Sequence, residues 1–104
     1  MKTLVLGSGV SLAAAAAQAA VRPKTTPFLP GTNTTILLVT EGGTGAFAVK
    51  VQGSDDGVAY TDLLTVTTQG PAVLKDVTVQ AWMRLNVTAA GTAGTVSAYL
   101  LGGP

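Results

Sequence analysis

The residues best suited to chemistry are three aspartates, Asp55, Asp56 and Asp62, which lie close together in the sequence. Their carboxylates could bind calcium, or could act as the acid and base of a glycoside hydrolase. Calcium needs about six to eight oxygen ligands, and a glycosidase needs two carboxylates that face each other across the substrate. Asp55 and Asp56 instead share one expected turn, residues 53–57. We therefore interpret these acids as solvated turn residues.

Other catalytic groups are missing, because the chain contains no His and no Cys. Its many Ser and Thr hydroxyls lack an imidazole that could activate them, and no thiolate is present to form a disulfide or bind a metal. Lys50 and Lys75 are isolated on expected strand or turn surface, which is typical of solubilising groups. The sequence predicts that the protein is not an enzyme and has no metal and no cofactor.

The first 22 residues allow three interpretations. Residues 7–9, Gly-Ser-Gly, could begin a dinucleotide-binding turn, but Leu12 stands where its third glycine belongs, and no βαβ pattern follows. Met1–Ala20 also has the pattern of a cleaved secretory signal peptide, which would make the protein secreted. We favour an ordered N-terminal arm, residues 1–22, that lies on neighbouring subunits and includes a short alanine-rich helix over residues 13–20.

Charge and hydropathy bear on the class of partner. The formal net charge is +1 and the basic residues are scattered, whereas nucleic-acid binding needs clustered cations. No run reaches the roughly 20 apolar residues of a membrane-spanning helix. We therefore expect neither nucleic acid nor membrane as a partner. The mean hydropathy is nevertheless +0.47, and this excess indicates apolar surface that partners cover.

Residues 23–33 are predicted to form an extended linker to a β domain at residues 34–104. Three prolines in this segment fix the backbone and remove amide donors, which disfavours both helix and central strand. Phe28 and Leu29 are apolar residues on the linker. They could pack on their own domain or insert into a groove of a neighbouring subunit, and the sequence leaves both possibilities open.

Short alternating runs separated by turns fill the β domain. Phe47, Val49 and Val51, for example, share one face of a strand, as expected when one side meets the core. We expect strands over residues 35–40, 46–52, 60–67 and 95–101, with one or two more over residues 73–87. About six to eight short strands predict an all-β fold, a jelly-roll-like antiparallel β-sandwich with an extended N-terminal arm.

The single tryptophan, Trp82, lies opposite the apolar stripe if residues 77–87 form one unbroken strand. A bulge or turn near residues 80–81 would flip the side chain into the core. Without such a break, Trp82 and Arg84 would be neighbours on an exposed face, and both residue types commonly anchor protein interfaces. Tyr99 falls opposite the apolar face of the last strand, so it is expected to join the same patch.

Two segments carry a resemblance to known sandwich domains. Val51–Leu63 resembles a hairpin of discoidin-type domains, in which a Gly-Ser-x-Asp-Gly turn is followed by a strand that begins at an aromatic residue. Ala81–Val87 is similar to the later aromatic-x-Arg-Leu strand of the same domains. With the chain length and the final Thr-, Gly- and Val-rich strand, these segments look like the small decoration (cement) proteins of tailed-phage heads.

This resemblance implies a structural protein on the outer surface of a virion capsid. Its partners would be the major capsid protein and neighbouring copies of itself, with a trimer at a three-fold site as one arrangement. Residues of the arm, the linker and the Trp–Arg pair are the expected contacts: Leu4, Val5, Leu6, Val10, Leu12, Phe28, Leu29, Trp82 and Arg84. The alternatives are a discoidin-like carbohydrate-binding module, secreted or displayed on a virion, and a phage tail or neck component.

Overall fold

Eight β-strands and no helix make up the described part of the chain, residues 2–24 and 28–102 of the computed structural model. The strands are β1 (Lys2–Ser11), β2 (Ala16–Ala17), β3 (Asn33–Thr44), β4 (Ala48–Ser54), β5 (Thr61–Val66), β6 (Val73–Thr78), β7 (Trp82–Ala89) and β8 (Ala93–Gly102). The expected strands of the β domain are all present, and the region predicted to hold one or two strands contains both β6 and β7.

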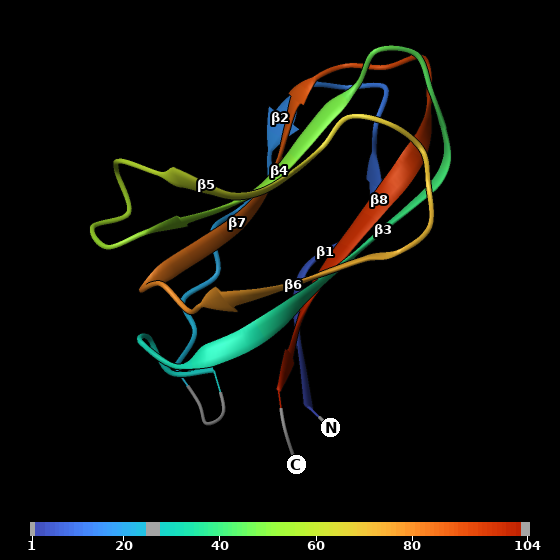
Figure 1. Cartoon of the computed structure of the whole chain (residues 1–104). Coiled ribbons are helices and arrows are strands. Elements are labelled where there is room, and N and C mark those ends of the chain that lie inside the picture. The colour runs from blue at the N-terminus through green and yellow to red at the C-terminus, as the bar shows by residue number, and fades with distance from the viewer. Residues whose placement is uncertain (1, 25–27, 103–104) are drawn as a thin grey trace.

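The strand pairing is that of one long hairpin that has been rolled up. Strand β1 pairs with β8, β2 with β7, β3 with β6 and β4 with β5, and all these pairs are antiparallel. Rolling places β3 beside β8 and β4 beside β7, which gives two four-stranded sheets in the orders β1-β8-β3-β6 and β2-β7-β4-β5 (Figure 1). The predicted antiparallel β-sandwich is confirmed, and its strand order is that of a jelly roll.

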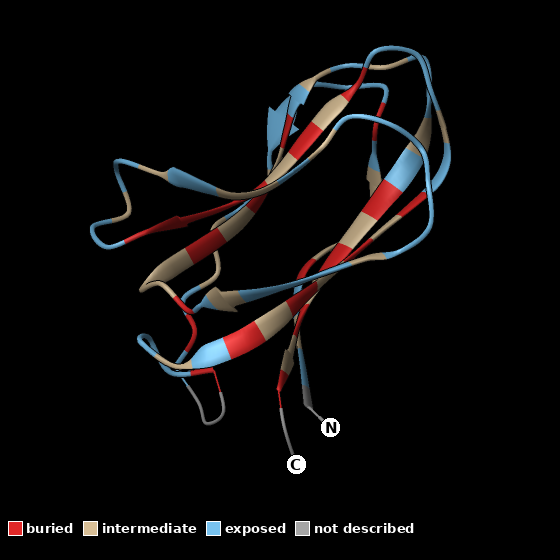
Figure 2. Cartoon of the chain, viewed as in Figure 1, coloured by how far each residue is buried: buried red, intermediate tan, exposed pale blue. Residues whose placement is uncertain are grey.

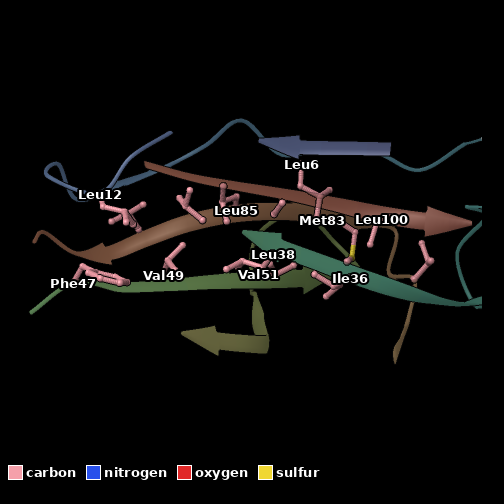
Figure 3. Close-up of a cluster of buried hydrophobic side chains, with 14 of the residues drawn as sticks. Leu6, Leu12, Ile36, Leu38, Phe47, Val49, Val51, Met83, Leu85 and Leu100 are labelled. Carbon is pink, nitrogen blue, oxygen red and sulfur yellow. The ribbon is translucent and has the colours of Figure 1, made fainter. Parts of the chain in front are cut away.

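The core lies between the two sheets and is built from alternate residues of each strand. Figure 2 shows buried positions recurring at every second residue along β3, β7 and β8. The buried face of β4 includes Val49 and Val51, and Phe47 just before this strand is also buried, as the alternation predicted. Leu12 lies beside Phe47 at one end of the core (Figure 3). Burying each such side chain stabilises the fold by roughly 1.5–3 kcal/mol.

The structure differs from the expected N-terminal arm, because residues 2–11 are the edge strand β1 of the sandwich. The pairing with β8 runs from Lys2 opposite Gly102 to Ser11 opposite Thr95, with irregularities around Gly7. Leu6 and Leu12 are 3 % and 0 % exposed and belong to the same core as the other strands. The segment therefore completes its own domain.

The helix predicted over residues 13–20 is wrong. Ala16 and Ala17 form β2 against β7, and the amides of Gln18 and Val21 donate to the carbonyls of Leu85 and Met83 at 2.8 and 2.7 Å. A helix of about two turns is marginal in water despite its alanines. The edge of β7 offers the same backbone groups partners within a sheet, so pairing outweighs helix propensity.

The segment expected as a linker connects the two sheets and adds to the core. Residues 25–27 of that segment lie outside the described residues, as do Met1 of the expected arm and residues 103–104 of the β domain. Pro23 is buried, and Phe28 is 4 % exposed and packs in the core. Leu29 is 41 % exposed. Of the two alternatives for this pair, packing on its own domain therefore holds for Phe28.

Candidate functional site

The turn between β4 and β5 holds Asp56 as a structural residue. Its Oδ1 accepts hydrogen bonds from the amides of Val58 and Ala59, at 2.8 and 3.0 Å, and from the hydroxyl of Ser54 at 3.0 Å. These donors favour the charged carboxylate, so they lower the pKa of Asp56, with the Val58 amide as the largest cause. The carboxylate closes its own turn, as the interpretation as a turn residue implies.

The variant Asp56→Asn should lose less stability in acid than the wild type does. Because the pKa of Asp56 is lowered in the folded protein, its contribution is complete above the ordinary value of 3.8 and disappears as the pH falls through the lowered pKa. Asparagine can accept the same bonds without titrating. We expect the urea midpoint of the variant to fall less steeply below about pH 4 than that of the wild type. Asp55→Asn, which removes a charge but none of these bonds, is the control; equal slopes for Asp56→Asn and wild type would contradict the prediction.

Asp62 belongs to a hydrogen-bonded network on the outer face of the second sheet. Its two oxygens accept from Lys50 Nζ at 2.7 Å and from Gln52 Nε2 at 2.8 Å. The lysine, followed by the glutamine, lowers the pKa of this carboxyl. Gln52 Oε1 in turn accepts from Arg84 Nε at 2.8 Å and from Asn86 Nδ2 at 3.1 Å. The network covers Gln52 so well that it is only 8 % exposed although it points away from the core.

Two arginines on this face each lie over an aromatic ring. The guanidinium of Arg84 is 3.8 Å from the centre of the Tyr60 ring, and that of Arg22 is 4.4 Å from the centre of the Trp82 ring. Such cation–π contacts contribute about 0.5–2 kcal/mol, more when water is excluded. We call this surface the arginine face, and define it by the charged and polar side chains that point outward from the second sheet and its flanking segments: Arg22, Lys50, Gln52, Tyr60, Asp62, Trp82, Arg84 and Asn86.

The structure decides between the alternatives for Trp82 in part. The strand is interrupted at residues 79–81, between β6 and β7, close to the predicted position. Trp82 nevertheless stays on the outer face and is partly exposed, while the next residue, Met83, is fully buried. Tyr99 does not join it, because Tyr99 lies on β8 in the other sheet. The prediction of one shared aromatic patch is wrong.

The outer face of the first sheet carries apolar side chains in register. Val5 is paired with Tyr99, Tyr99 with Leu37, and Leu37 with Leu74, so the four residues form one row across β1, β8, β3 and β6. We call these four residues the apolar row. Its two ends are the most exposed, with Val5 at 49 % and Leu74 at 64 %. A contiguous apolar surface of this kind commonly marks a contact with another protein.

The contact residues expected from the sequence are dispersed over the molecule. Leu6, Leu12 and Phe28 are buried in the core, and Leu4 and Val10 pack against it, which leaves them little surface for a partner. Three parts of the surface hold the others. Val5 lies in the apolar row, Leu29 lies on the β2–β3 connection, and Trp82 and Arg84 lie on the arginine face. The structure brings together only this last pair.

Sequence reasoning missed most of both surfaces. The outward positions of β4 and β7 could have been found, because Lys50 and Gln52 alternate with buried valines, as Arg84 and Asn86 alternate with buried residues of β7. Tyr60 was expected at the start of a strand over residues 60–67, but β5 begins at Thr61, so the direction of the Tyr60 side chain does not follow from alternation. The apolar row could not be found from periodicity, because its members come from four strands whose relative register is a property of the fold.

Two hollows of the described surface hold few groups that could do chemistry. One of about 500 Å³ beside β3 and β6 has Asp76 as its single ionisable residue, and another of similar size between β5 and β6 has none. Within residues 2–24 and 28–102, no three acidic side chains lie close enough to hold a metal ion. The described chain also has no helix long and apolar enough to cross a membrane.

No protein-family model, curated protein or solved structure matched this chain.

Proposed function

We propose that this protein is a structural virion protein that decorates the outside of a phage head and stabilises the shell. The observation that carries the proposal is the apolar row on the outer face of the first sheet. Val5 and Leu74 expose much of their apolar surface at its two ends, although the core between the sheets is complete without them. Such a surplus of exposed apolar surface favours a contact with a large protein partner.

The proposed partner is the major capsid protein in its assembled form. A site shared between neighbouring capsid subunits exists only after assembly, so binding there favours the assembled shell over free subunits. At a free concentration of about 100 times the Kd, such binding stabilises the bound state by about 2.7 kcal/mol. The mechanism is thermodynamic linkage and needs no catalytic group.

The difference between the two outer faces supports this role. The first sheet presents the apolar row, whereas the second sheet presents ionised side chains held by hydrogen bonds. A protein that covers a shell needs one face suited to a protein surface and one suited to water. Residues 2–11 complete the sandwich, so each copy would add to the shell as a preformed unit.

The test is the copy number of this chain in purified virions of its source, measured by quantitative mass spectrometry against the major capsid protein. A copy number near that of the capsid protein supports the proposal. A copy number far below that of the capsid protein would instead indicate a tail or neck component. Absence from virions would overturn the proposal and favour the secreted carbohydrate-binding alternative.

The apolar row can be tested directly with Leu74→Lys. This substitution places a charge at the most exposed position of the apolar row, and we expect it to weaken co-sedimentation with capsids at least tenfold, which corresponds to about 1.4 kcal/mol. Stability should change little, because Leu74 is 64 % exposed. Val58→Lys is the matched control, since Val58 is also an exposed apolar residue but lies on the β4–β5 turn. Equal binding of the two variants would exclude the row as the contact.

A further inference from the structure

The arginine face contains two guanidinium groups that already pack against aromatic rings before any ligand binds. Arg84 is held by its Nε bond to Gln52 and by the ring of Tyr60, and Arg22 is held over the ring of Trp82. Trp82 and Arg84 are two residues apart on β7, so they lie side by side on one face, at a spacing of about 7 Å. Ordering a long side chain is one of the entropy costs of binding, and these contacts reduce that cost.

Neither arginine has a carboxylate partner among the described residues. The one salt bridge found there joins Lys50 to Asp62. Asp56, in the adjacent turn, is engaged by the amides of its own loop. The hydrogen bond that Arg84 donates to Gln52 uses Nε, which leaves its two terminal nitrogens as the donors for a ligand. A planar guanidinium pairs best with a planar carboxylate through two parallel hydrogen bonds.

The surroundings of the arginines favour one class of ligand. A protein partner needs an open apolar centre, and the two rings of the arginine face, Trp82 and Tyr60, each have a guanidinium over them, whereas the apolar row is uncovered. Nucleic acid needs a denser array of cations than Arg22, Arg84 and Lys50, whose charge Asp62 partly offsets. Asn86 and Asp62 add polar groups that can bond to hydroxyls. Carboxylate groups surrounded by hydroxyls are characteristic of acidic sugars.

We infer that the arginine face binds a glycan that carries carboxylate groups, with Arg22 and Arg84 as the residues that bind the carboxylates. This inference goes beyond the proposed structural role and does not depend on it, because it uses the sheet opposite the apolar row. On a decorated shell, the arginine face would remain open to solvent while the apolar row is covered.

The test is calorimetric titration of the full chain with an oligomer of galacturonic acid. Neutral dextran of similar length, sulfated dextran, poly-glutamate and a single-stranded DNA oligomer serve as comparison ligands. We expect binding of the galacturonate oligomer that weakens with salt, and no binding of neutral dextran. No binding of galacturonate, or binding of sulfated dextran, poly-glutamate or DNA that equals or exceeds it, would overturn the inference.

The variants separate specific recognition from general charge. Arg84→Lys keeps the charge but loses the planar fork and its contact with Tyr60, so we expect a loss of affinity of at least tenfold. The double variant Arg22→Gln with Arg84→Gln should abolish binding. Lys24→Gln removes a charge from an exposed position near Arg22 in the sequence and should bind as the wild type does. Thermal unfolding of each variant confirms folding, and a loss in Lys24→Gln equal to that in Arg84→Lys would also overturn the inference.

Discussion

Deletion of residues 1–21 is expected to leave a chain that does not fold. The deletion removes β1, which pairs with β8 from Lys2 to Ser11, and with it the buried side chains of Leu6 and Leu12. Replacing one such leucine by alanine typically costs about 2–5 kcal/mol, and a domain of this size is stable by only about 5–15 kcal/mol. Circular dichroism with urea should show no cooperative unfolding transition.

Two single substitutions on β1 serve to interpret this deletion. Leu6→Ala should lower the free energy of unfolding by about 2–5 kcal/mol, because Leu6 is 3 % exposed. Val5→Thr, at the neighbouring outward position, should change it by no more than about 0.5 kcal/mol. A deleted chain that unfolds cooperatively at the wild-type midpoint would show that residues 1–21 are a separate arm after all.

Gly94→Ala is expected to be the most damaging single substitution among the glycines. Gly94 has a φ of +111°, which residues with a side chain rarely adopt. An added Cβ would lie 2.6 Å from Gly43 Cα and 2.7 Å from Gly43 N, and these are backbone atoms that cannot swing away. Strain and overlap together should cost about 3–5 kcal/mol, measured as the change in free energy of urea unfolding.

Two other glycines separate the strain from the overlap. Gly42 has a φ of +62° with open space around its Cα, so Gly42→Ala should show the strain alone, at about 1 kcal/mol. Gly70 has open space and no positive φ, so Gly70→Ala should leave stability unchanged or raise it slightly. If Gly94→Ala were no worse than Gly42→Ala, the close approach of β8 to Gly43 would be disproved.

The strands of the β domain could be predicted because their signal is local. Phe47, Val49 and Val51 alternate with more exposed residues, and that alternation needs only one strand and one core. The strand at the N-terminus was missed because its signal is not local. Gly7 and Gly9 interrupt the alternation of β1, and its partner, β8, lies at the opposite end of the sequence. The alanine run was wrongly predicted to be a helix. Its helix propensity contributes less stability than the backbone hydrogen bonds that it forms with the edge of β7.

The candidate surfaces depend on register between strands, which a sequence does not contain. Arg84 and Trp82 were singled out from their residue types, but their ring partners were not. Tyr60 directly precedes β5, and its ring meets Arg84 on β7, which lies beyond β4 in the sheet. The apolar row likewise exists only after four strands have been aligned. Composition indicated that apolar surface is in excess, and only the fold shows where it lies.

The nested pairing of the strands also determines when the protein can fold during its synthesis. Strand β1 is made before the other seven strands but pairs with β8, which is made after them. Until β8 is made, Leu6 and Leu12 lack core residues that they pack against in the folded protein, and the growing chain exposes apolar side chains that the finished core buries. Closing so long a loop is slow, and half-formed sheets are prone to associate. The sandwich can therefore close only once β8 has emerged, so synthesis of most of the domain precedes the pairing of its first strand.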